Sequence, residues 1–146
     1  MRKIAWILNA LLLGGTAMAV DFTGTWKLNP EKSPGTRLVS ATIELQQTGS
    51  NAYRTTADYA YKSGKTAHLE MTRVYDGQER HVDGDGMTAQ GTEICEITPD
   101  GSRKITFKEN GKVVGVITAT YSADGRTMTH TLSNDTGKYV EIYEKQ

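Results

Sequence analysis

The sequence predicts an all-β domain, an antiparallel up-and-down β-barrel of about eight to ten strands. From Phe22 onward, apolar and polar residues alternate with a period near two, which is typical of half-buried strands, and no helical period is sustained. Threonine occurs twenty times, and Val, Ile and Tyr are frequent, so β-branched and aromatic side chains dominate. Turn signals recur about every eight to twelve residues.

The candidate strands follow one another along the chain, separated by short polar segments. They are Gly24–Leu28, Leu38–Gln47, Ala52–Tyr61, Thr66–Tyr75, Glu79–Val82, Thr92–Thr98, Arg103–Lys108, Lys112–Tyr121, Thr127–Ser133 and Lys138–Lys145. Turns such as Asp76-Gly77, Asn110-Gly111 and Asp124-Gly125 place glycine where a tight hairpin requires a positive φ. Sequential hairpins pair each strand with its sequence neighbour, and closure removes aggregation-prone edges. We therefore expect a closed or nearly closed barrel rather than a flat sandwich.

Two of these strands carry specific expectations about their faces. Lys112–Tyr121 is apolar on both sides, which predicts a strand covered on two faces. Thr127–Ser133 alternates, with Met128, His130 and Leu132 on one side and threonines on the other. His130 would then point into the barrel, although a hydrogen-bonded structural histidine is the more common outcome for such a residue.

Residues 1–19 are expected to be a signal peptide, and residues 20–146 the folded domain. Arg2 and Lys3 form a basic start, an apolar stretch follows, and Ala17-Met18-Ala19 supplies a small-x-small cleavage site. The apolar stretch is shorter than the roughly 20 residues that span a bilayer, and no second one follows. We expect a periplasmic or secreted protein without a membrane span.

Charge and cysteine content exclude several classes of protein. Without the first 19 residues, fifteen Lys and Arg face seventeen Asp and Glu, so nucleic acid is not an expected partner. Cys95 is the single thiol, which excludes an intramolecular disulfide. Because Glu93 and Glu96 flank Cys95, we expect a buried strand residue rather than a reactive thiol.

Both ends of the domain resemble the calycins, the superfamily that joins lipocalins and fatty-acid-binding proteins. Phe22–Asn29 contains the Gly24-Thr25-Trp26 of an opening strand, and Ile142–Lys145 is similar to the closing strand of fatty-acid-binding proteins. Small secreted lipocalin-like domains of bacteria are the most similar. An indole on the first strand of a barrel can plug one end of it, and Gly24 permits close backbone approach. The resemblance to lipocalins implies that a cation covers the indole. Lys138, Arg126 and Lys145 are the candidates for that cation.

The sequence also departs from the fatty-acid-binding proteins. Only nine residues, Asn29–Arg37, separate the first two strands, so the two-helix lid of those proteins does not fit. Glu141 stands where those proteins place an arginine that holds the lipid carboxylate. Two carboxylates about 4 Å apart repel by roughly 4 kcal/mol at an effective dielectric constant of 20, so that binding pose is disfavoured.

The resemblance implies that Tyr139, Glu141 and Tyr143 face the lumen, whereas apolar content alone would place Val140 and Ile142 there. On the first alternative, the candidate ligand-binding residues are Tyr139, Glu141, Tyr143, His130 and Arg73. Glu141 could donate a hydrogen bond to a ligand or pair with an amine.

The expected function is binding of a small, largely apolar molecule in the barrel lumen, without a cofactor. The first alternative is an interaction or structural module of the cell envelope whose barrel is filled by its own side chains. The second is an enzyme that uses Glu141 and His130 as acid and base. His81, Asp83 and Asp85 could offer at most three metal ligands, so we expect a solvated turn and no metal site.

Overall fold

The computed structural model describes residues 20–82 and 91–146, which form ten antiparallel strands and contain no helix. The strands are β1 (Gly24–Leu28), β2 (Leu38–Gln47), β3 (Ala52–Tyr61), β4 (Thr66–Val74), β5 (Glu79–His81), β6 (Thr92–Ile97), β7 (Arg103–Glu109), β8 (Lys112–Tyr121), β9 (Thr127–Asn134) and β10 (Gly137–Lys145). All ten candidate strands are present, and their predicted ends are correct to within one residue. No helix in these two ranges is long and apolar enough to cross a membrane.

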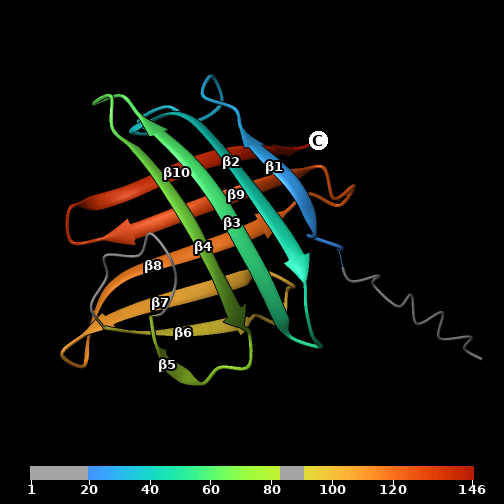
Figure 1. Ribbon diagram of the computed structural model, residues 1–146, viewed down its shortest axis with the longest axis vertical. Coiled ribbons are helices and arrows are strands. Elements are labelled where there is room, and N and C mark those ends of the chain that lie inside the picture. Colours follow the sequence, from blue (N-terminus) through green and yellow to red (C-terminus); the bar gives the residue numbers. More distant parts are fainter. Residues whose placement is uncertain (1–19, 83–90) are drawn as a thin grey trace, which may run out of the picture.

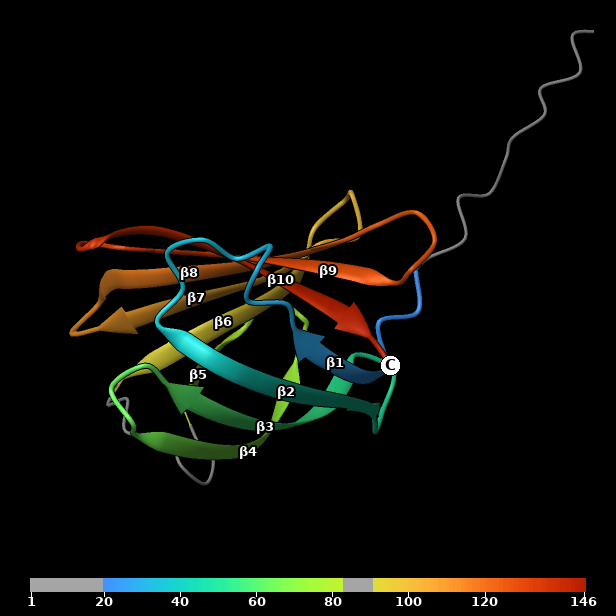
Figure 2. The same cartoon turned by 90° about the horizontal axis from the view of Figure 1, so that it is seen from above.

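The strands form one curled sheet in the order β4-β3-β2-β1-β10-β9-β8-β7-β6-β5. Hairpin neighbours pair throughout, and β1 joins the two halves of the sheet by pairing with β10, with Trp26 opposite Lys145. Figures 1 and 2 show β2–β4 crossing over β6–β9, so that the sheet folds back on itself. Among the described residues no ladder joins β4 to β5. The predicted antiparallel up-and-down arrangement of ten strands is confirmed, as a curled half-barrel with a seam between β4 and β5 rather than the closed or nearly closed barrel expected from the sequence.

The expectation that β8 is covered on both faces is wrong. Ala119 is its one buried residue, and Val113 is 58% exposed. The pairing of β7 with β8 shifts register, since Phe107 lies opposite Gly115 but Lys108 lies opposite Val113. Val114 is therefore an extra residue, and this bulge reverses the alternation of side chains before it. The apolar residues on both sides of β8 in the sequence therefore result from this bulge, and not from burial of both faces of the strand.

Trp26 anchors an aromatic cluster at one end of the sheet. Its side chain is fully buried, and its indole Nε1 donates to the carbonyl of Phe22 at 2.9 Å. Tyr121 lies beside the indole, with 5.7 Å between ring centroids. Of the candidate cations, Lys145 covers the ring, with its Nζ 5.5 Å from the centroid. Gly24 has a φ of 111°, and a Cβ there would lie 3.1 Å from Lys145 Cε, so glycine permits this close approach.

A buried ion pair crosses the seam between the two halves. Arg73 on β4 donates through Nε to both carboxylate oxygens of Glu93 on β6, at 3.3 and 3.2 Å. Both side chains are less than one-tenth exposed. None of the described strands pairs with β4 on this side, so the ion pair links β4 to β6 across the seam.

Candidate functional site

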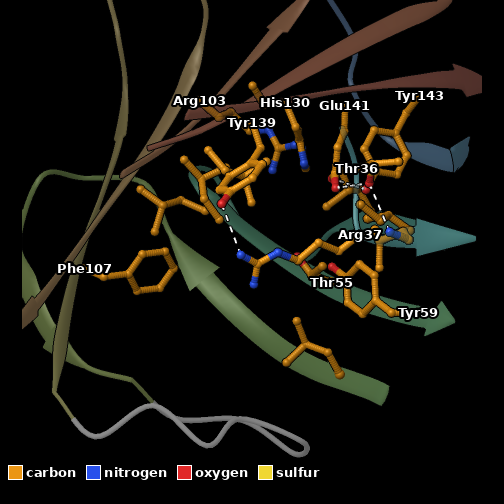
Figure 3. A pocket seen from close by; sticks show the side chains of 18 of the residues that line it. Thr36, Arg37, Thr55, Tyr59, Arg103, Phe107, His130, Tyr139, Glu141 and Tyr143 are labelled. Carbon is orange, nitrogen blue, oxygen red and sulfur yellow. Dashed lines mark hydrogen bonds between the residues drawn. The ribbon is translucent and has the colours of Figure 1, made fainter. Parts of the chain in front are cut away.

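The curled sheet encloses a cavity of about 400 Å3 (Figure 3). Much of its wall is apolar, contributed by strands from both halves of the sheet; this part consists of Leu38, Ile43, Leu45, Leu69, Ile105, Phe107, Ile117, Ala119 and Leu132. The remainder is made of tyrosines, threonines, His130, Asn134 and a few charged groups. An apolar wall with few polar groups is typical of a site for a small organic ligand.

The structure brings all five candidate ligand-binding residues to this cavity: Arg73, His130, Tyr139, Glu141 and Tyr143. On β10 the residues implied by the calycin resemblance therefore face inward. Val140, which apolar content alone would have placed inside, is 38% exposed.

Glu141 lies in the cavity wall as a hydrogen-bond acceptor. Its Oε1 accepts from the hydroxyl of Thr36 at 2.8 Å, and its Oε2 accepts from the hydroxyl of Tyr143 at 2.9 Å (Figure 3). The Thr36 oxygen itself accepts from the backbone N–H of Leu38, which leaves its single proton for Glu141. Burial, and next the negative charge of Glu141, raise the pKa of the Tyr143 hydroxyl well above its ordinary value. Both hydroxyl groups are thus held as donors to this carboxylate.

His130 lies directly opposite Glu141 in the pairing of β9 with β10. Its ring centroid is 5.0 Å from that of Tyr143, and within the described part of the chain its nitrogens form no hydrogen bond. Burial, and next the charges of Arg103 and Arg73, lower the pKa of His130 to about 3. The imidazole is therefore neutral at ordinary pH, with one N–H donor and one acceptor nitrogen. The alternative of a hydrogen-bonded structural histidine does not hold among these residues.

The two buried arginines of the wall, Arg73 and Arg103, differ in their partners. Arg73 is compensated by Glu93, whereas the described residues place no carboxylate within ion-pair distance of Arg103. Arg103 donates instead to the hydroxyls of Tyr75 and Tyr121. Its guanidinium carbon lies 4.8 Å from the ring centroid of Phe22, so aromatic groups enclose it at the Trp26 end.

Arg37 and Tyr139 lie together at a more exposed part of the wall. The Arg37 guanidinium donates to the Tyr139 hydroxyl at 3.1 Å and lies 5.3 Å from the ring centroid (Figure 3). Its hydrogen bond with Thr136, and next the one from Arg37, lower the pKa of the Tyr139 hydroxyl.

Sequence reasoning missed several polar residues of the wall: Thr36, Arg37, Thr55, Tyr59 and Arg103. Arg103 carried a usable signal, because it alternates with Ile105 and Phe107 and so shares their inward face. The Thr55 hydroxyl is buried without a hydrogen-bond partner. Thr36 gave no local signal, because it lies in the loop before β2 rather than in a strand.

Metal and thiol chemistry find little support in the described residues. No group of three metal-ligating side chains occurs in 20–82 and 91–146; His81 is exposed, and Asp83 and Asp85 lie outside these ranges.

Cys95 is buried, and burial, with Glu93 adding to it, raises the pKa of its thiol to about 12. A thiol of that pKa is a poor nucleophile near neutral pH.

An antiparallel meander that curls around an interior cavity, with its first strand paired to its last, defines a barrel like that of the fatty-acid-binding proteins and other calycins. No family model matches the chain, and no curated protein matches its sequence. Solved structures do match.

The chain is similar to Echinococcus granulosus fatty-acid-binding protein 1, with a TM-score of 0.63, 18% identity, and coverage of 85% of this chain and 96% of that one. The Schistosoma mansoni fatty acid binding protein in complex with arachidonic acid has a TM-score of 0.60 and 14% identity, with coverage of 88% of this chain and 98% of that one. The zebrafish ileal bile acid-binding protein complexed with cholic acid has a TM-score of 0.54 and 16% identity, with coverage of 86% of this chain and 98% of that one. These similarities establish the shared fold.

Proposed function

We propose that this protein binds a small, largely apolar molecule inside its barrel. The observation that carries the proposal is the cavity of about 400 Å3, with an apolar wall and a polar cluster at Glu141. Ligand cavities commonly measure roughly 300–1,000 Å3. The structural neighbours support the proposal, because their names describe fatty-acid-binding and bile-acid-binding proteins.

The cavity also separates this function from its alternatives. A barrel filled by its own side chains would have no cavity above roughly 300 Å3, and the observed one is larger. For catalysis, Glu141 and His130 lie opposite each other, but an imidazole whose pKa is about 3 carries no proton to donate as imidazolium near neutral pH. We therefore propose binding rather than catalysis.

Native mass spectrometry of protein taken directly from its host tests the proposal. We expect an adduct of constant mass that is lost on extraction with organic solvent, and a polarity-sensitive neutral dye such as Nile red should then bind the extracted protein. Leu69→Trp, which fills part of the cavity wall, should reduce dye binding, whereas Val113→Trp on the exposed face of β8 should not. Repeated recovery without an adduct, together with no dye binding, would refute the function.

We also propose that residues 1–19 direct export and that the protein acts in the periplasm or outside the cell, as a secreted lipocalin-like domain of the bacterial type. The basic start and the Ala17-Met18-Ala19 site support this proposal. Intact-mass measurement on fractionated host cells should find a chain beginning at Val20 outside the cytoplasm. Recovery of the full chain from the cytoplasm alone would contradict it.

A further inference from the structure

The polar cluster in the cavity wall is built around a hydrogen-bond acceptor. Both oxygens of Glu141 accept a hydroxyl proton, one from Thr36 and one from Tyr143. An ionised carboxylate has about four lone-pair sites, so about two remain for a ligand. Nothing at Glu141 can donate while it is held in this way, so a ligand group that meets it must carry a donor hydrogen.

His130 supplies what Glu141 lacks. Residues directly opposite each other in an antiparallel pair have Cβ atoms about 4.5–5.5 Å apart, on the same face of the sheet. A neutral imidazole presents one N–H donor and one acceptor, and neither is used by a described residue. A group placed between the two side chains can donate to Glu141 and accept from His130. A hydroxyl group does both, whereas a carboxylate can only accept.

The interior charges point the same way. Within residues 20–82 and 91–146, the buried charged side chains are those of two arginines, Arg73 and Arg103, and two glutamates, Glu93 and Glu141. Their charges sum to zero, so a neutral ligand preserves the balance and an ionised one disturbs it. Two lining cations, Arg37 and Arg103, have no carboxylate partner among the described residues, but both already donate hydrogen bonds. Arg103 donates to Tyr75, Tyr121 and the Met128 sulfur, and Arg37, at the exposed part of the wall, donates to Tyr139.

We propose that Glu141 and His130 select a neutral hydroxyl group as the polar end of the ligand, and that the cavity discriminates against carboxylates. The ligand class is then a neutral alcohol-bearing amphiphile rather than a fatty acid. This inference rests on the proposed function, because it concerns the polar end of the molecule bound in the same cavity.

Matched probes test the selection without any substitution. 1-Decanol, decanoate and decylammonium share one alkyl chain, so differences in their dissociation constants isolate the polar end. Calorimetric titration near pH 8, where decanoate is ionised, should give 1-decanol an affinity about tenfold or more above that of decanoate. Decylammonium should also bind more weakly than 1-decanol, because it adds a charge. An equal or higher affinity for either ionised probe would overturn the inference.

Glu141→Gln tests whether the carboxylate causes the preference. We expect 1-decanol to bind about tenfold more weakly, because a charge-assisted hydrogen bond is lost, and decanoate to bind more tightly. Glu44→Gln removes the same charge from the exposed face of β2 and is the matched control, with both affinities unchanged. An unaltered ratio of affinities in a folded Glu141→Gln protein would refute the role of Glu141. If this variant does not fold, the probe series on the unaltered protein still decides the selection.

Failure of the inference and failure of the proposed function give different results. Tight decanoate binding with weak 1-decanol binding would leave the barrel a binding protein but assign its polar cluster to an anion. No binding of any probe and no Nile red fluorescence would refute both.

Discussion

Removing one partner of the seam ion pair should strongly destabilise the barrel. In Glu93→Gln, Arg73 keeps its charge but loses the carboxylate that accepts its Nε–H at 3.3 and 3.2 Å. Both side chains are less than one-tenth exposed, so water cannot take over the lost interaction without opening the seam. Breaking a buried pair costs about 3–5 kcal/mol, and the amide oxygen retains part of the hydrogen bonding, so we expect about 3 kcal/mol.

Urea denaturation measures this change. Trp26 is the only tryptophan after residue 19 and is fully buried, so its fluorescence reports unfolding of a chain of residues 20–146. With an m-value of about 1–3 kcal/mol/M, a loss of about 3 kcal/mol lowers the midpoint by about 1–3 M. Glu70→Gln, which breaks an exposed ion pair with Arg54, should have a much smaller effect.

A double variant separates the buried charge from the contact. Replacing both Arg73 and Glu93 by leucine removes the uncompensated charge and should recover much of the stability lost in Glu93→Gln, since buried pairs are often replaceable by apolar residues. A midpoint for Glu93→Gln that matches the unaltered protein would refute the reasoning. It would mean that the seam opens to water or that Arg73 finds another partner.

Three further measurements test other parts of the interior. Thr55→Val should raise the free energy of unfolding by about 1 kcal/mol in urea titration, because the buried hydroxyl has no partner; a destabilised variant would show that the hydroxyl is bonded in solution. Cys95 should resist a thiol reagent near pH 8 in the folded protein and react after unfolding, because burial raises its pKa to about 12; rapid labelling of the native state would contradict this. His130 has a folded pKa of about 3 against an ordinary 6.5, so the unfolded state binds the extra proton and stability should fall as the pH decreases from 6.5 toward 3. His130→Gln should reduce that slope, and an equal slope in both proteins would refute the assignment.

Most of the fold was predictable from the strand pattern. Apolar and polar residues alternate along the strands, and turns that contain glycine mark where many of the strands end. Asn110 and Gly111 both have positive φ, as a tight hairpin between β7 and β8 requires. The bulge at Val114 had no comparable signal, since an extra residue in one strand depends on the pairing of its partner. The error about the faces of β8 came from that residue.

The inward face of β10 shows where local pattern is insufficient. Val140 and Ile142 alternate with Tyr139, Glu141 and Tyr143, so both faces satisfy a period of two. The pairing of β1 with β10 decides between these two faces. Residues directly opposite each other in an antiparallel pair share a face, and buried Leu28 lies opposite Tyr143, so Tyr143 and Glu141 face inward. That pairing joins the two ends of the chain, which only the resemblance could indicate.

The two buried arginines explain why residue type alone could not assign the polar end of the site. The sequence made Arg73 a candidate ligand-binding residue, but its charge is neutralised by Glu93, twenty residues away across the seam. Arg103 lies in the same wall, where two tyrosine hydroxyls and the Phe22 ring surround its guanidinium. Glu141 is different, because the described residues give it hydroxyl donors but no cation at ion-pair distance. On our proposal, its remaining acceptor sites receive the proton of a ligand hydroxyl group, whose oxygen in turn accepts the His130 N–H.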